Sequence, residues 1–353
     1  MLRFLIVSLA CFYSVISWGS QTKYYEYINK AEEKFVLTLN RECFNYYDSA
    51  FATDAQYFAK DAYIAAEIAL FLKDNDLFLK YVKLSFDLGL PWTAIKSGKI
   101  IEGQLTPGLE AELKELFTTR KEPDFDHQVR DKVYDYAYRS DSIKLIMGRS
   151  VEQENLFFAI ENEFRNYLYT SFLLKGVFPN ENLIGIATDS VYQDFLKRFN
   201  KVDLYSNSSG NSFGQQEAPP QEYDLVAKYS YSVLLHSRCS FSKFQKELWN
   251  AVLNGYLLPS EYALLHETSI LWNSNSRNPW DDCEPAYQEA YYNLLGFNPM
   301  KRIQTHVDES NKELMEQVEL NRKNIYMQKW EIDKKKKEIQ KKTGIRFFFG
   351  FLS

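Results

Sequence analysis

Residues 54–72 (DAQYFAKDAYIAAEIALFL) and residues 75–89 (NDLFLKYVKLSFDLG) decide the fold class. Both stretches carry apolar side chains at every third or fourth position, which is the spacing of one face of an α-helix. Asn75 is a good N-cap for the second stretch. Gly89 and Pro91 end that stretch, because glycine accepts a left-handed cap and proline cannot continue a helix. The two stretches therefore predict a pair of helices joined by a short turn.

The same helical spacing recurs along most of the chain. Residues 24–35 begin it, residues 150–174 give the longest stripe, and Ser150 with Gln153 has the spacing of a capping box. No stretch shows the sustained alternation of apolar and polar side chains that is typical of a half-buried strand. We therefore predict an all-α fold of stacked antiparallel helix pairs, similar to an α-solenoid.

The composition is that of an ordinary globular protein. The 353 residues carry a formal charge of −5, and 25% of them are charged while 45% are hydrophobic. These values exclude a disordered, a collagen-like or a polytopic membrane protein. Only 14 Gly and 10 Pro interrupt the chain, so long helices are expected. The 26 Phe and 25 Tyr residues are enough to fill a sizeable core.

Residues 1–19 predict a secretory signal peptide. Arg3 supplies the positive charge near the start, and a short apolar stretch follows it. Ser17 and Gly19 are small residues at the −3 and −1 positions of a cut before Ser20. The stretch is too short and too mixed to span a bilayer well. We therefore expect an exported protein, either periplasmic or secreted.

A buried N-terminal helix and a lipoprotein cut before Cys11 are alternatives to the signal peptide.

The cysteines leave the disulfide state open. Loss of the leader leaves Cys43, Cys239 and Cys283, which allow at most one intramolecular disulfide. Cys239 with Cys283 is the expected pair because both lie in one half of the chain, and buried free thiols are the alternative. Apolar burial must therefore hold the fold together.

Composition divides the rest of the chain into segments. Residues 20–204 predict a first helical domain, and residues 223–305 predict a second one. Residues 205–222 separate them and are rich in Ser, Asn, Gln, Gly and Pro without periodicity, which indicates a flexible linker or loop. Residues 306–353 predict a long basic helix with a Phe-rich tail.

The helix expected in the last segment has apolar side chains every seven residues, at Val318, Ile325, Ile332 and Ile339. The complementary column of the heptad is polar. A two-stranded coiled coil needs both columns apolar. We therefore expect this helix to pack on its own domain, with a dimer seam as the alternative, and the oligomeric state stays open.

Two further features belong to the last segment. Lysines occupy residues 334–337, and this short run predicts a solvated helix face rather than a nucleic-acid site. Residues 345–352 are strongly apolar but too few to cross a membrane as a helix. They predict a tail that folds back to fill a groove. An interfacial membrane contact and a partner-binding tag are the alternatives.

The helix pair at residues 54–72 and 75–89 resembles a tetratricopeptide repeat. Ala65 and Ala69 stand where the first helix of such repeats keeps small residues, and Ser85 takes the small-residue place in the second helix. The resemblance covers roughly 40 residues, and no second copy follows at the repeat's period of about 34 residues. It implies helix pairs that stack to form a concave surface.

More widely, the layout resembles exported bacterial proteins, chiefly of the Bacteroidota type, that join a helical-repeat-like first half to a helical second domain of unknown function. The stretches that carry this resemblance are residues 234–237 (LLHS), 247–252 (ELWNAV), 262–267 (YALLHE) and 321–325 (NRKNI). The resemblance implies export and helical architecture, and it implies no particular activity.

One group of residues has the types needed for catalysis. His236 and His266 are expected near the ends of two helices in neighbouring hairpins, and histidine beside a carboxylate such as Glu267 moves protons near neutral pH. Cys239 is a candidate nucleophile if its pKa is lowered. The alternative is structural, since a histidine at a helix C-terminus favours the dipole there. The sequence has no phosphate loop, G-x-S-x-G, H-E-x-x-H or C-x-x-C motif, and no metal or cofactor is expected.

These observations favour an exported helical interaction protein that binds a peptide or a partner protein. We expect Trp249, Tyr262 and Arg238 to contribute to its binding surface, because aromatic and arginine side chains dominate such contacts. One alternative is a hydrolase-like enzyme that uses the two histidines and Glu267. The other is a membrane-associated factor that docks through residues 345–352. Nucleic-acid binding is not expected.

Overall fold

The computed structural model describes residues 2–96, 98–144, 150–186, 189–202, 230, 234, 240–273 and 309–347. Within these ranges the side chains of residues 2–18, 189, 190, 240, 242 and 267–273 are not described. All regular elements in the described part of the chain are helices, so the all-α prediction is confirmed. They are α1 (Leu2–Thr38), α2 (Cys43–Ala50), α3 (Ala59–Phe71), α4 (Asn75–Asp87), α5 (Trp92–Lys96), α6 (Lys99–Glu102), α7 (Pro107–Thr118), α8 (His127–Lys144), α9 (Val151–Ser171), η1 (Leu173–Lys175), α10 (Glu181–Ile184), α11 (Asp189–Arg198), α13 (Ser240–Leu253), α14 (Pro259–Asn273), α15 (Lys312–Asn324) and α16 (Trp330–Thr343).

Helices α3 and α4 form the expected hairpin and pack closely against each other. Asp74, one residue before the predicted Asn75, is the N-cap of α4, and its carboxylate accepts a hydrogen bond from the Leu77 N–H. Asp74 is a cap because its backbone is not helical, whereas Asn75 already occupies the first turn. Gly89 follows α4 with a φ of +97°, the left-handed conformation that its position predicted.

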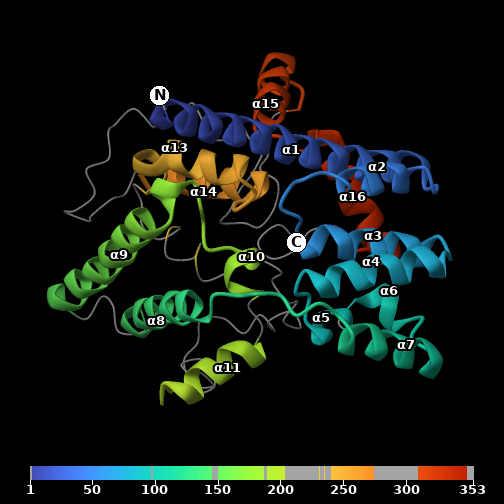
Figure 1. Ribbon diagram of the computed structural model, residues 1–353, viewed down its shortest axis with the longest axis horizontal. Helices are drawn as coiled ribbons and strands as arrows, with labels where there is room; N and C mark the ends of the chain where they lie inside the picture. Colours follow the sequence, from blue (N-terminus) through green and yellow to red (C-terminus); the bar gives the residue numbers. More distant parts are fainter. Residues whose placement is uncertain are drawn as a thin grey trace.

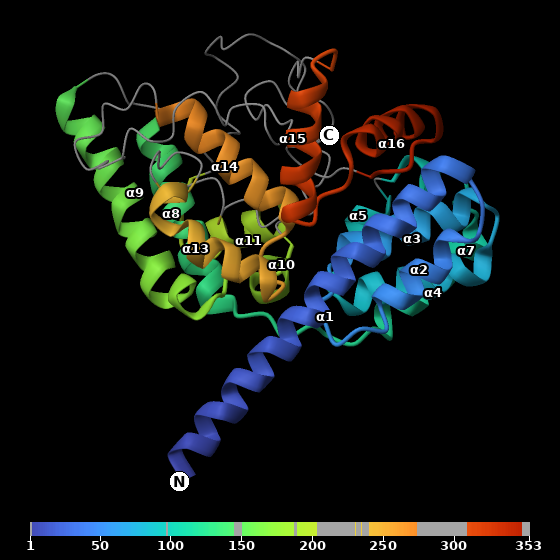
Figure 2. The same ribbon diagram turned by 90° about the horizontal axis from the view of Figure 1, so that it is seen from above.

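The helices gather in two groups. Helices α1 to α7 form one group, and α8, α9, α10, α11, α13 and α14 form the other (Figures 1 and 2). The α15–α16 hairpin lies beside both groups (Figure 2). One hydrophobic core nevertheless runs through all of them, since Tyr24, Phe78, Phe164, Leu248 and Ile332 belong to the same buried cluster. The segments expected as separate helical domains therefore share a core.

Helix α1 connects the two groups. The Tyr25 hydroxyl donates to the carbonyl oxygens of Val252 (3.0 Å) and Leu257 (3.3 Å) at the turn between α13 and α14. The Gln21 amide donates to the Gln56 carbonyl (3.2 Å) and accepts from the Gln56 N–H (2.9 Å). These bonds satisfy buried backbone groups of two distant loops and fix the direction of α1 relative to both.

The prediction of one long helix within residues 306–353 is wrong, because the structure has two helices, α15 and α16, separated by residues 325–329. Tyr326 has a φ of +58°, and the Met327 N–H returns to the Arg322 carbonyl at 2.9 Å. The Asn29 side chain on α1 donates to the Tyr326 carbonyl at 2.8 Å. Local sequence has no helix breaker there. The break is stable because Asn29 on α1 supplies a partner for the Tyr326 carbonyl, which a continuous helix would have paired within itself.

The break divides the heptad stripe between two environments. Val318 packs with Trp330 in a small cluster between α15 and α16. Ile332 joins the main core, and Ile325 and Ile339 pack against it. The stripe therefore packs on its own chain, as predicted, but from two helices that point in different directions.

The first part of the apolar tail folds back into the protein. Ile345 is fully buried, and Phe347 is 5% exposed with its ring 6.1 Å from that of Phe35 on α1. The backbone N–H of Arg346 donates to the Glu67 carboxylate at 2.6 Å. The prediction of a groove-filling tail is confirmed for residues 345–347, and residues 348–353 lie outside the described part.

Several sequence predictions fall outside the described residues. They include the linker of residues 205–222 and all of residues 274–305. Within the described chain, none of the helices combines the length and the hydropathy that a membrane crossing requires.

The approach of α6 to α3 gives a test of the packing. A Cβ atom at Gly98 would lie 2.1 Å from the Tyr63 hydroxyl oxygen, so Gly98→Ala should lower the free energy of unfolding by about 1–3 kcal/mol. In a Tyr63→Phe background, which lacks that oxygen, the cost of Gly98→Ala should shrink. Urea denaturation measures both.

Gly108 is the matched control, because a Cβ there meets no atom within 4 Å and the residue is exposed in α7. Gly108→Ala should leave stability unchanged or raise it by up to about 1 kcal/mol. Equal effects of Gly98→Ala in both backgrounds would contradict the proposed clash.

Candidate functional site

The catalytic residues expected from the sequence are only partly described. His236, Arg238, Cys239 and Cys283 lie outside the described residues, as does the side chain of Glu267. The sites and the disulfide that depend on them stay predictions.

His266 lies on α14 in an apolar environment. Its ring meets the ring of Phe241 edge to face, with centroids 4.9 Å apart. Burial lowers the pKa of His266 to about 4. The imidazole is therefore neutral at physiological pH, and it is a weaker proton acceptor there than an exposed histidine.

Trp249 and Tyr262, the aromatic residues expected to bind a partner, contact each other, and their role in binding stays a prediction. The Trp249 and Tyr262 rings meet edge to face at 5.4 Å, and Trp249 also stacks on Tyr326 at 6.1 Å. Tyr262 is only 7% exposed, whereas Trp249 is half-buried. This contact joins α13 and α14 to the turn between α15 and α16.

Three buried carboxyl groups meet near the start of α3. Asp61 accepts a hydrogen bond from the Tyr24 hydroxyl at 2.7 Å. Glu181 on α10 accepts the Ala59 N–H at 3.0 Å and so caps α3 from a distant segment. Glu261 caps its own helix by accepting the Leu258 N–H at 2.7 Å. All three side chains are buried, which makes them costly to ionise.

Their pKa values follow from this burial. Burial, with the nearby Glu261 charge as the next cause, raises the pKa of Glu181 to about 8. Burial also raises the pKa of Glu261 to about 7 and raises that of Asp61, although Lys60 opposes both shifts. Each carboxyl group already holds a helix end or a tyrosine, so we interpret the three as structural.

A second buried set of charges holds the α15–α16 hairpin on α1. The ammonium group of Lys336 pairs with Glu32 on α1 and, at 3.3 Å, with Asp333. Asp333 also pairs with the Arg322 guanidinium, which donates to the Gln328 carbonyl at 2.6 Å. We call Glu32, Lys336, Asp333 and Arg322 the ion chain. Burial alone would lower the pKa of Lys336, but the charges of Glu32 and Asp333 raise it.

The expectation of a solvated lysine face is therefore wrong for Lys336, which is 5% exposed. Lys336 follows Ile332 by four residues, and that spacing places both on the helix face that packs on α1. Two neighbouring lysines are closer to the expected solvated face. Lys334 and Lys335 are partly exposed and pair with Glu309 and Glu331.

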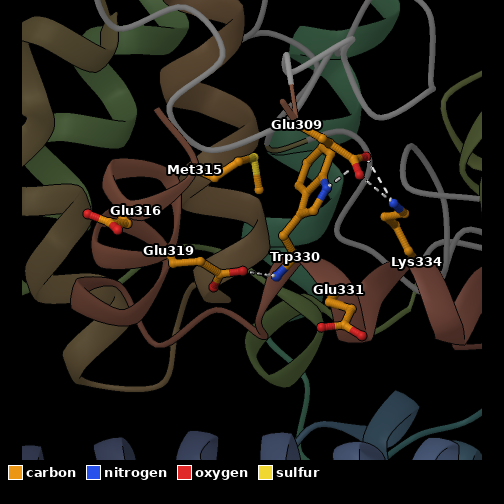
Figure 3. Close-up of a pocket in the computed structure, with 7 residues that line it drawn as sticks. All are labelled: Glu309, Met315, Glu316, Glu319, Trp330, Glu331 and Lys334. Atoms are coloured by element: carbon orange, nitrogen blue, oxygen red, sulfur yellow. Dashed lines mark hydrogen bonds and ion pairs between the residues drawn. The ribbon is translucent and has the colours of Figure 1, made fainter. Parts of the chain in front are cut away.

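The hairpin also forms a groove between α15 and α16 with a volume of about 640 Å³ (Figure 3). Seven residues line it: Glu309, Met315, Glu316, Glu319, Trp330, Glu331 and Lys334. Four carboxylates against one ammonium give this lining a strong excess of negative charge. Met315 and Trp330 add apolar surface. We call this hollow the acidic groove.

Hydrogen bonds fix two sides of the acidic groove. Glu319 on α15 accepts the Trp330 N–H at 3.0 Å and so caps α16. Glu309 accepts the Trp330 indole N–H at 3.4 Å and the Lys334 ammonium at 2.7 Å (Figure 3). In the part of the chain that the structure describes, Glu331 forms one ion pair, with Lys335 at 3.1 Å, and 74% of its side chain is exposed. Among the described residues, Glu316 makes no ion pair.

The acidic groove was not predicted from the sequence. Glu316 and Glu319 are three residues apart and share a face of α15, which is a visible pattern. The opposing wall comes from α16, and only the break at residues 325–329 turns it toward them. In the described part of the chain, no group of three or more His, Cys, Asp or Glu residues is placed to hold a metal ion.

The buried carboxyl groups predict a pH-dependent stability. In the folded protein Glu181 holds its proton up to about pH 8 and Glu261 holds its proton up to about pH 7, whereas both carboxyl groups release theirs near pH 4.5 in the unfolded chain. The folded state therefore binds more protons, and the free energy of unfolding should fall as pH rises through this window. In Glu181→Gln and Glu261→Gln, urea denaturation from pH 5 to pH 8.5 should show a flatter dependence. The exposed Glu112→Gln should keep the wild-type slope, and identical slopes in all variants would contradict the prediction.

The ion chain gives a second prediction. Lys336→Met leaves Glu32 buried without its cation and should destabilise the protein by about 3–5 kcal/mol. The pair Glu32→Gln with Lys336→Met should cost less than the sum of the single changes, as measured by denaturant unfolding.

Lys335→Met is the matched control for this cycle. The pair that Lys335 makes within the described residues is an exposed one with Glu331, so its loss should cost less than about 1 kcal/mol. Similar losses of stability in Lys336→Met and Lys335→Met would show that the ion chain does not hold the hairpin on α1.

No protein-family model, curated protein or solved structure matches this chain. The resemblance to tetratricopeptide repeats and to exported bacterial proteins therefore stays a prediction, and the residues of the chain itself carry the functional argument.

Proposed function

We propose that the chain is an exported helical interaction protein that binds a basic segment of a partner protein in the acidic groove. One observation carries this proposal, namely a hollow of about 640 Å³ lined by four glutamates and one lysine beside an apolar wall. A groove with this charge attracts cations and repels the phosphates of nucleic acids and anionic lipids.

The chemistry of the lining selects the kind of side chain that fits. Lysine and arginine have an aliphatic stem and a charged end. The stem would lie along Met315, which packs on the cluster of Val318 and Trp330. The charged end would meet Glu316 and Glu331, the two lining carboxylates least engaged by other residues of the described chain.

The groove is held in its shape before a partner arrives. Glu309 and Glu319 tie α15 and the residues before it to Trp330, and the ion chain ties the hairpin to α1. A preformed site loses little conformational entropy on binding, so modest contacts can yield useful affinity. The proposal includes a tetratricopeptide-like stacking of the preceding helix pairs, which would form the scaffold that supports the groove.

The enzyme hypothesis gains no support from the described residues, since His266 is neutral and packs on Phe241. Membrane contact through residues 345–352 would require Ile345 and Phe347 to leave the core. Both hypotheses stay predictions, and partner binding is the function that the geometry supports best.

A fluorescence anisotropy titration tests the proposal with a labelled lysine-rich peptide and an acidic peptide of the same length. We expect the lysine-rich peptide alone to bind, and binding should weaken as salt rises. Glu316→Gln with Glu331→Gln should weaken it by about three- to tenfold, because each exposed ion pair contributes up to about 1 kcal/mol.

Glu112→Gln is the control, since Glu112 is exposed on α7 outside the groove. Absence of binding, or equal loss with the control variant, would contradict the assignment of the groove.

A further inference from the structure

The acidic groove already holds one cation of the protein itself. The Lys334 ammonium group on α16 donates to both carboxylate oxygens of Glu309, at 2.9 Å and 2.7 Å. Glu309 precedes α15, so this pair joins the two sides of the groove. In Figure 3 the pair lies on the opposite side of Trp330 from Glu316. The groove therefore has one carboxylate that binds a lysine and, apart from it, one that makes no ion pair within the described residues.

The pair of Lys334 with Glu309 is accessible to water. The side chain of Lys334 is 41% exposed and that of Glu309 is 51% exposed. Exposed ion pairs are weak, because water and salt screen the two charges. The hydrogen bonds from Lys334 and from the Trp330 indole lower the pKa of Glu309, so this carboxyl group is ionised at neutral pH. Replacement of the Lys334 ammonium group by another cation at Glu309 therefore costs little.

A displaced Lys334 side chain has a second partner within reach. Glu338 follows Lys334 by four residues on α16, and residues at this spacing are neighbours on a helix surface. Glu338 is exposed, lies outside the lining of the acidic groove and makes no ion pair among the described residues. An ammonium group that leaves Glu309 can therefore pair with Glu338, which draws it away from the groove.

We propose that Lys334 is an internal competitor for the acidic groove, and that a basic segment of a partner protein binds by displacing the Lys334 ammonium group from Glu309. The proposal rests on the proposed function of the groove and adds its regulation. The wild-type protein pays for displacement, so its affinity is lower than that of an unoccupied groove. The competitor also favours segments with more than one basic side chain, because one cation replaces Lys334 while another meets Glu316.

A structural role of Lys334 would have the opposite effect on binding. If Lys334 held Glu309 in place, removal of its charge would loosen the groove and weaken binding. The contacts of the groove argue against this role. Glu309 also accepts the Trp330 indole N–H at 3.4 Å, and Glu319 accepts the Trp330 backbone N–H at 3.0 Å. The walls of the groove therefore keep their connection without Lys334.

A fluorescence anisotropy titration of the full chain with the labelled lysine-rich peptide tests the proposal. Lys334→Gln should bind the peptide about three- to fivefold more tightly, the change that corresponds to the loss of one exposed competing ion pair. The gain should shrink as salt rises. Lys334→Arg keeps the competing charge and should bind as the wild type does.

Lys342→Gln is the charge-matched control, because Lys342 is exposed on α16 outside the lining of the groove. Its affinity should differ from that of the wild type by less than about twofold, since distant surface charges are screened. Thermal unfolding should give all three variants a Tm close to that of the wild type, because each change affects an exposed side chain.

The outcomes separate this proposal from the function on which it rests. Unchanged or weaker binding in Lys334→Gln, or an equal gain in Lys342→Gln, would overturn the competitor and leave peptide binding in the groove intact. Binding by Lys334→Gln alone would support the competitor and show that Lys334 closes the wild-type groove to this peptide. Absence of binding by both the wild type and Lys334→Gln would overturn the proposed function together with the competitor.

Discussion

The buried pairing of Lys336 with Glu32 and Asp333 is the interaction on which the C-terminal part of the structure depends. It takes an ammonium group out of water on the face of α16 that packs on α1. Such a charge is tolerated only if paired, and here the partners come from α1 and from the preceding turn of α16. The pairing selects one position for the hairpin, because any shift along α1 leaves the charges apart.

The position of the hairpin creates the acidic groove. Trp330 begins α16, and it lies beside α15 because the break at Tyr326 reverses the chain and Glu319 caps the new helix. The residues that fix the break are polar ones on both sides of the interface, such as Asn29 and Gln328. The groove is therefore a product of packing against α1 and not of the hairpin alone.

Polar groups also set the geometry of the other helix groups. Glu181 comes from α10 and caps α3, while Tyr25 on α1 donates to the α13–α14 turn. Apolar burial supplies the bulk of the stabilisation, as the aromatic content predicted. The hydrogen bonds of these few buried polar groups fix the orientation of the helices relative to one another, because apolar contacts alone allow packed helices to rotate and slide.

Much of the helical architecture could be predicted because it depends on local spacing. The α3–α4 hairpin, the cap of α9 at Ser150 and the end of α4 at Gly89 each follow from residues within a few positions of one another. The burial of the apolar tail was also predictable, since the transfer of the Ile345 and Phe347 side chains out of water is favourable. The partner of Phe347, which is Phe35 on α1, was not visible in the sequence.

The sequence by itself determined that the chain is helical, where helices such as α4 and α9 begin or end, and which of their side chains are apolar and favour burial. Tertiary structure alone decided that the last helix breaks in two, that Lys336 is buried, and that Glu316 and Glu331 line one hollow. The reason is physical. Helical periodicity is a property of neighbours three and four residues apart, whereas a buried charge or a helix break is stable only when a distant segment supplies its partners.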